Sequence, residues 1–339
     1  MPLSYTGVLE EHHAVRTKVG LFDISHMGRF ELSGKGADAY LEGLTPGPVR
    51  KLQRGGAHYS MLLNESGRIL DDIYIYKRGT HRYFIIVNAA NRAKDFLWMT
   101  SKLPASDVTL SDVTDQTALL ALQGPLSWQV LVQTIPFGKT EIPLRGFIET
   151  EMVALRGSKL LVARTGYTGE RGYELVMPIG LAEQVWDVLM TAGAASGIRP
   201  IGLGARDTLR LEKGYLLYGQ DMTESHSPIE AGMVRFIDFR KEFIGKAALQ
   251  SQSPASQKLV GFVLEGEGIP RTGCMIYSDH KTIGKVTSGN FSPLLKKGIG
   301  LGYVERRYAE EGGELLIDIR GREVTAVIVT PPFYSKKKK

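Results

Sequence analysis

A change of pattern near residue 251 limits the folds that this chain can adopt. Before it, amphipathic helical segments and strand-like segments alternate irregularly, with glycines marking frequent turns. After the linker-like segment SQSPASQ, at residues 251–257, the pattern is almost wholly short strands and turns, with five strand-like runs. The sequence therefore predicts an α+β protein that ends in a small all-β barrel or sandwich.

We expect a larger region at residues 1–250 and a C-terminal β-domain at residues 258–334. Two hairpins are predicted in the larger region, one pairing YSMLLN with ILDDIYIYKR and one pairing KLLVART with YELVMPI. Helical patterns are predicted at residues 91–103, 181–194 and 203–213, together with a first helix that closes at Gly20 and another that begins at Pro125.

The composition excludes several classes of protein. With 43% hydrophobic and 23% charged residues, the chain is neither disordered nor fibrous. No stretch approaches the roughly 20 apolar residues of a membrane span, and the N-terminus lacks a signal core. The single cysteine, Cys274, cannot form an intrachain disulfide, which favours a reducing compartment. We therefore expect a cytoplasmic protein that does not bind a membrane.

Charge and histidine spacing limit the ligands. The net charge of +6 suits an acidic partner, but four lysines form the terminal run at residues 336–339. Without that run the net charge falls to about +2, and no basic stretch interleaved with aromatic residues suggests base stacking. The seven histidines form no pair with metal-ligand spacing. We therefore expect neither nucleic acid nor a metal ion as a ligand.

The segment ILDDIYIY places a carboxylate on an apolar face. Because side chains alternate across a strand, Asp71 shares a face with three isoleucines, whereas Asp72 lies among tyrosines and can be solvated. A buried carboxylate is unfavourable unless hydrogen bonds or a positive charge compensate it. Asp71 is therefore either a structural aspartate that caps a loop or pairs with an arginine, or a general base or ligand-orienting group.

Two further segments allow more than one interpretation. The loop GYTGERGYE, at residues 166–174, is either a wide hairpin turn or a place where the backbone closely approaches a ligand. It lacks the spacing of a nucleotide-binding loop. In GLGARDTLRLEKG, Arg206, Arg210 and Lys213 follow helical spacing along one face, which is either a solvated surface or an anion site.

Seven segments between residues 11 and 304 together resemble the aminomethyltransferase (T-protein) family of the glycine cleavage system. In chain order they are EHHAVRTKVGLFDISHMG, YSMLLNESGRILDDIYIY, VNAANRAKDFLWM, RTGYTGERGYEL, GLGARDTLRLEKGYLLYGQD, FIGKAAL and KVTSGNFSPLLKKGIGLGYV. The resemblance implies a three-domain cloverleaf fold around a folate pocket, with two interleaved α+β subdomains in residues 1–250. Family members usually begin upstream of the segment MPLSY, so we expect a shortened first domain.

The resemblance also implies an activity. Members of the family use tetrahydrofolate as a co-substrate and take an aminomethyl group from the lipoyl arm of the H-protein, their partner. They release ammonia and form 5,10-methylenetetrahydrofolate. Two alternatives share the fold: a folate-dependent demethylase, and a non-catalytic folate-binding iron–sulfur assembly protein, whose usual cysteine motif is missing from this sequence.

Site residues follow from the same resemblance. Asp71 falls on the family's catalytic aspartate, close to the reactive end of the pterin, where it is expected to position the folate or to accept a proton. Glu174 and Arg206 fall on substrate-binding positions. Tyr59, Asn88 and Met27 match positions that line the folate pocket.

Overall fold

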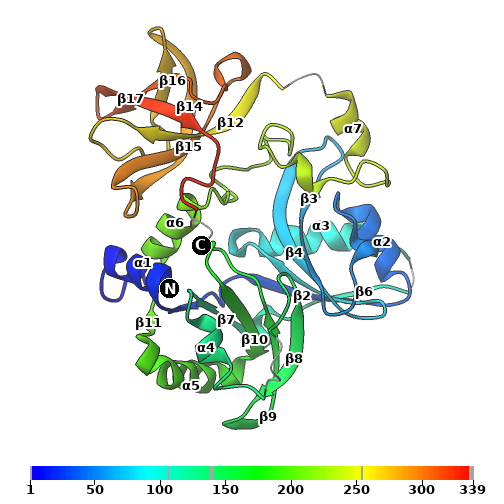
Figure 1. Ribbon diagram of the computed structural model, residues 1–339. Helices are drawn as coiled ribbons and strands as arrows, with labels where there is room; N and C mark the ends of the chain where they lie inside the picture. Colours follow the sequence, from blue (N-terminus) through cyan, green and yellow to red (C-terminus); the bar gives the residue numbers. More distant parts are fainter. Residues whose placement is uncertain (1, 106, 137–140, 253–254, 336–339) are drawn as a thin grey trace. The chain divides into compact units, whose positions relative to one another are not determined.

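The computed structural model describes residues 2–105, 107–136, 141–252 and 255–335 (Figure 1). The chain divides into two units. Unit 1 contains Met1–Leu63, Leu70–Ala205 and Phe236–Lys246, and unit 2 contains Asn64–Ile69, Arg206–Arg235 and Ala247–Lys339. Two residues of the expected linker, 253–254, and the lysine run at 336–339 lie outside the described residues. The domain boundaries expected at 250 and 258 stay a prediction.

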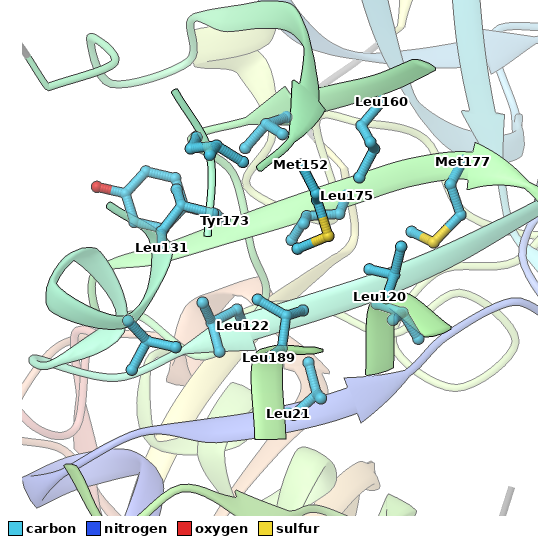
Figure 2. Close-up of a cluster of buried hydrophobic side chains, with 14 of the residues drawn as sticks. Leu21, Leu120, Leu122, Leu131, Met152, Leu160, Tyr173, Leu175, Met177 and Leu189 are labelled. Carbon is cyan, nitrogen blue, oxygen red and sulfur yellow. The ribbon is translucent and has the colours of Figure 1, made fainter. Parts of the chain in front are cut away.

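The larger sheet of unit 1 covers the hydrophobic core drawn in Figure 2, where Leu122, Tyr173 and Leu175 enter one cluster. Because Tyr173 and Leu175 enter this core, Glu174 between them projects from the opposite face. The second predicted hairpin is confirmed, since β9 and β10 pair antiparallel. The strand order is β11–β1–β7–β10–β9–β8, with bounds β1 Gly20–Asp23, β7 Thr117–Gln123, β8 Phe147–Met152, β9 Leu155–Ala163, β10 Gly172–Pro178 and β11 Arg199–Pro200.

The second sheet of unit 1 has five strands and its own core, which includes Phe30, Leu62, Ile75 and Val87. The first predicted hairpin is confirmed, because β3 and β4 are hydrogen-bonded neighbours in this sheet. The strand order is β3–β4–β5–β2–β6, with bounds β2 Gly28–Ser33, β3 Ala57–Leu63, β4 Ile69–Gly79, β5 Arg82–Val87 and β6 Thr109–Asp112.

The helices of unit 1 confirm the patterns predicted at 91–103 and 181–194, but two boundaries were wrong. The first helix ends at Thr17, and Gly20 opens β1, where an added Cβ would lie 2.6 Å from the side chain of Val15. α4 begins at Ser127 rather than Pro125, because Leu126 is the N-cap, whose carbonyl accepts a helical hydrogen bond from the Val130 N–H (3.2 Å). The bounds are α1 Val8–Thr17, α2 Ala37–Leu44, α3 Arg92–Ser101, α4 Ser127–Leu131 and α5 Ala182–Gly193.

Unit 2 confirms the predicted all-β ending, since its strands form a closed barrel in the order β12–β15–β14–β13–β16–β17. The predicted helix at 203–213 is α6, Leu203–Glu212, and α7 is Lys246–Ser251. The sequence missed β13, which has only 4 residues. The strand bounds are β12 Gln257–Leu264, β13 Met275–Ser278, β14 Lys281–Ser292, β15 Lys297–Glu305, β16 Glu314–Ile319 and β17 Arg322–Val329.

Glycines on β15 make room inside the barrel. Gly300 lies opposite Phe262 on β12, and an added Cβ at Gly300 would come within 2.4 Å of the Phe262 ring. A fully buried phenylalanine thus takes the space that a side chain at Gly300 would need.

In the described part of the chain, no helix combines the length and apolar character needed to cross a membrane.

Candidate active site

Asp71 is held in one orientation by three N–H groups. The residue lies on β4 with none of its surface exposed, which confirms its predicted burial. Its Oδ2 accepts a hydrogen bond from the Asn88 backbone N–H (3.0 Å), and its Oδ1 accepts from Nδ2 of Asn88 (2.9 Å) and of Asn91 (2.6 Å). Both asparagines lie between β5 and α3. These bonds to a carboxylate compensate its burial and order the connection.

Asp72, which the sequence allowed to be fully solvated, is half-buried and hydrogen-bonded. Its Oδ1 accepts a hydrogen bond from Nδ2 of Asn88 (2.7 Å), and its Oδ2 accepts one from the Tyr59 hydroxyl (3.0 Å). Burial, followed by the charge of Asp71, raises the pKa of Asp72 to about 7. One asparagine amide therefore bridges two carboxyl groups, and the second of them titrates near neutral pH.

The titration of Asp72 predicts a pH-dependent stability. The folded chain holds a proton that the unfolded chain, with an Asp pKa near 3.9, releases, so the free energy of unfolding falls as pH rises from about 4 to about 7. The loss is at most about 1.4 kcal/mol per pH unit, the limit for one proton. Urea unfolding across this range is expected to show a steeper fall for the wild type than for Asp72→Asn. Parallel pH profiles for the two proteins would contradict the raised pKa.

An aromatic path links this pair to a third carboxylate. The Tyr59 ring packs edge-on against Tyr74 at 6.3 Å between centroids, and Tyr74 lies 5.3 Å from Tyr76. The Tyr76 hydroxyl is 3.4 Å from Oε2 of Glu174, and burial, followed by the charge of Glu174, raises the pKa of Tyr76 well above its usual value. We refer to these connected side chains as the carboxylate network: Asp71, Asp72, Asn88, Tyr59, Tyr74, Tyr76 and Glu174.

Glu174 lies between two alanines of the neighbouring strands. In the register of the sheet, Glu174 on β10 lies opposite Ala121 of β7 and Ala163 of β9, so its cross-strand neighbours are alanines. The Glu174 carboxylate accepts hydrogen bonds from the Thr165 and Tyr76 hydroxyls. The sequence did not identify Thr165 or Tyr76. The only local signal for Tyr76 was that it shares a strand face with Asp72.

Two glycines of the segment at residues 166–174 are explained by packing. An added Cβ at Gly166 or Gly172 would come within 2.1 or 2.2 Å of the buried amide of Gln123, so small residues are needed there. Gln123 accepts a hydrogen bond from the Thr168 hydroxyl (2.9 Å), and Arg16 pairs with Glu170 at 3.1 Å. The interpretation as a structured turn therefore accounts for the glycines that contact Gln123.

Met27 and Arg206 lie outside the carboxylate network. Met27 follows β1, and its carbonyl accepts a hydrogen bond from Nη1 of Arg29 (2.6 Å). Arg206 is a half-buried residue of α6 in unit 2, whereas the network belongs to unit 1. The structure therefore brings together four of the predicted residues, Asp71, Asn88, Tyr59 and Glu174.

The predicted cationic row on α6 is wrong for Arg210. This side chain is 2% exposed, and its Nη1 donates to the Tyr215 carbonyl (3.1 Å) and to the fully buried Asp221 (2.8 Å). Its Nη2 donates to the Ser288 hydroxyl (2.8 Å) on β14. Arg210 therefore fixes α6 within unit 2 and is neither a solvated residue nor part of an anion site.

Comparisons with known proteins identify the family of the chain. The family model described as the GCVT N-terminal domain matches residues 1–241, and that of the glycine cleavage T-protein C-terminal barrel domain matches residues 257–335. The aminomethyltransferase of Geobacillus kaustophilus is 44% identical, covering 100% of this chain and 93% of the relative. That of Thermosynechococcus vestitus is 46% identical, covering 99% and 90%.

A solved structure supports the same assignment. The crystal structure of glycine cleavage system aminomethyltransferase T from Bartonella henselae matches with a TM-score of 0.90 at 32% identity. The match covers 98% of this chain and 91% of that chain. The fold class and the family resemblance predicted from the sequence are thereby confirmed.

Proposed function

Because the chain belongs to the glycine cleavage T-protein (aminomethyltransferase) family, we propose that it transfers the carbon of an aminomethylated, lipoylated H-protein to tetrahydrofolate. In this reaction the bonds from the carbon to the lipoyl sulfur and to the amino nitrogen break, and the carbon forms bonds to two nitrogens of tetrahydrofolate. The amino group departs as ammonia. The products are 5,10-methylenetetrahydrofolate and the dihydrolipoyl H-protein. The carboxylate network is the observation that carries the proposal, because it joins Asp71, Asn88, Tyr59 and Glu174 in one unit.

The chemistry of the network suits a reduced pterin. The amino-pyrimidine edge of a pterin presents N–H donors, and a half-buried carboxylate such as Glu174 is the matching acceptor. Tyr59 and Tyr74 are half-buried and offer flat, mostly apolar ring surfaces against which a planar heterocycle can pack. Tetrahydrofolate supplies the nitrogen nucleophiles that accept the carbon. We therefore assign folate binding to the part of unit 1 that contains the carboxylate network.

The proposed roles of Asp71 and Asp72 differ because their surroundings differ. Asp71 accepts three N–H hydrogen bonds in one fixed orientation, which suits positioning and stabilisation of positive charge. Asp72 has a pKa near neutral pH, which suits a group that accepts a proton during turnover. We therefore assign proton acceptance to Asp72 and positioning to Asp71.

We assign the remaining predicted residues from their chemistry and family positions. Arg206 is a permanent cation, suited to an anionic part of the substrate. Tyr59 holds Asp72 through its hydroxyl, and Met27 contributes apolar surface to the folate pocket.

A transfer assay tests the proposed function. Purified protein is mixed with aminomethylated H-protein and tetrahydrofolate, and both ammonia and methylenetetrahydrofolate are measured. The proposal expects both products in equal amounts. Tetrahydrofolate binding without transfer would instead favour the iron–sulfur assembly alternative. Transfer of carbon only from a methylated amine would favour the demethylase alternative.

Glu174→Gln is expected to weaken tetrahydrofolate binding by about 10- to 100-fold, because the amide replaces a charged acceptor with a neutral one. A direct binding titration measures the effect. The matched control is Glu183→Gln on α5, which makes the same charge change at an exposed position. An unchanged dissociation constant for Glu174→Gln, or an equal loss in the control, would remove Glu174 from the proposed folate site.

A further inference from the structure

The carboxyl group of Asp95 is buried, and the proposed roles of Asp71, Asp72 and Glu174 do not involve it. It lies in the first turn of α3 with none of its surface exposed. Neither of its oxygens accepts a hydrogen bond from any N–H or O–H group of the described residues. A carboxylate left in this state would be a strongly unfavourable buried charge. Burial without N–H or O–H donors therefore favours the protonated, neutral form of Asp95.

The carboxyl group of Asp71 interacts with that of Asp95. Asn91 is the N-cap residue of α3 and Asp95 lies four residues later, in the first turn, and both side chains interact with Asp71. The Asp95 carboxyl lies within hydrogen-bonding reach of the Asp71 carboxyl. A hydrogen bond between two carboxyl groups needs a proton on one of them, because an ionised carboxylate has no donor.

The hydrogen bonds decide which group holds the proton. Asp71 accepts three N–H hydrogen bonds, from Asn88 and Asn91, and these bonds favour its charged form. Asp95 accepts none from such donors and can satisfy itself only by donating an O–H. The proton therefore belongs on Asp95.

Other groups near Asp95 also influence its charge. The start of α3 and the ammonium of Lys94 favour a charged Asp95, whereas Asp72 opposes it. A helix dipole and a lysine that also donates to the Leu70 carbonyl act more weakly than a carboxylate in direct contact. Burial, followed by the hydrogen bond and charge of Asp71, raises the pKa of Asp95 to about 10. Among the described residues, no group of three or more His, Cys, Asp or Glu side chains is arranged to hold a metal ion in their place.

We propose that Asp95 is a positioning residue: a neutral carboxylic acid whose O–H donates a hydrogen bond to Asp71, so that the pair carries one negative charge, centred on Asp71. The catalytic consequence rests on the proposed function of Asp71. Together with Asn88 and Asn91, Asp95 completes a shell of donors around this carboxylate. Removal of the donor at position 95 therefore disturbs the orientation of Asp71 without touching the substrate.

Carboxyl NMR tests the protonation state without any substrate. The full chain is labelled with 13C at the aspartate carboxyl carbons and titrated from about pH 5 to about pH 9. We expect one resonance to keep the shift of a protonated acid throughout this range and to be missing from Asp95→Asn. In Asp71→Asn the same resonance is expected to ionise at a lower pH than in the wild type, because burial remains but the neighbouring charge has gone. An Asp95 resonance that is already ionised at pH 7 in the wild type, or one that does not respond to Asp71→Asn, overturns the proposal.

Kinetics test the positioning role. Asp95→Ala is expected to lower kcat by about 10-fold or more with little change in the KM for tetrahydrofolate, because one hydrogen bond to a charged group is lost. Asp95→Asn keeps a donor of the same shape and is expected to restore most of that loss. Equal losses in the two variants would contradict the donor role. If the wild type shows the protonated resonance but no transfer, the proposed function fails while the Asp71–Asp95 pair stands.

Discussion

Asp71→Asn is expected to lower methylenetetrahydrofolate formation by about 100-fold or more. The substitution removes the negative charge proposed to stabilise positive charge during transfer. It also replaces one oxygen with an NH2 group, although both carboxylate oxygens of Asp71 now accept hydrogen bonds from Asn88 and Asn91. The amide can satisfy only part of this shell, so the side chain loses its orientation as well as its charge. Steady-state assays with aminomethylated H-protein measure the loss.

A matched variant separates chemistry from general damage. Asp187→Asn makes the same change at an exposed position of α5, and its turnover is expected to stay close to that of the wild type. Circular dichroism shows whether Asp71→Asn is folded under the assay conditions. Turnover of folded Asp71→Asn within a few-fold of the wild type would remove Asp71 from the proposed chemistry.

Arg210→Met is expected to destabilise the protein by about 3 to 5 kcal/mol, because it leaves a buried charge without its partner. Asp221 has no exposed surface and lies 2.8 Å from Nη1 of Arg210. Asp221 also accepts from the Leu217 N–H (2.9 Å) and from the hydroxyls of Thr287 (2.5 Å) and Ser288 (2.9 Å), so protonating it would disturb several bonds. The free energy of unfolding in urea measures the effect.

Two further variants identify the cause of that loss. Arg307→Met removes an arginine whose side chain is 68% exposed, and it is expected to change stability by less than about 1 kcal/mol. Adding Asp221→Asn to Arg210→Met is expected to recover part of the loss, because the buried charge disappears while its hydrogen-bond acceptor remains. A small effect of Arg210→Met alone would show that Asp221 does not depend on the guanidinium.

The periodicity of side chains along the sequence predicted those features that depend only on residues within one helix or strand. Alternation along β4 predicted the burial of Asp71, and helical spacing predicted α3, α5 and α6. It failed for Arg210, because the partners that bury this side chain lie 11 and 78 residues away at Asp221 and Ser288. Spacing shows which residues share a helix face, but it does not show what that face contacts.

Asp72 shows the same limit at the site itself. Its neighbours in sequence are tyrosines and isoleucines, which suggested a solvated side chain. The groups that bind it, Tyr59 and Asn88, are 13 and 16 residues away on other segments of the chain. Glu174 is similar, since the Tyr76 hydroxyl is 98 residues away in sequence. No local pattern signals such contacts.

The sequence by itself determined the family, the α+β fold with its barrel ending, and the choice of Asp71 and Glu174 as carboxylates to test, but it did not single out Asp72 or Asp95. Motif order and side-chain periodicity are properties of the chain, so no three-dimensional information was needed for them. Only the tertiary structure decided the surroundings of each carboxyl group: Asp71 accepts three N–H hydrogen bonds, the pKa of Asp72 is raised to about 7, and Asp95 is buried beside Asp71. The physical reason is that desolvation and charge–charge interactions depend on distance through space, which folding sets between residues far apart in the sequence.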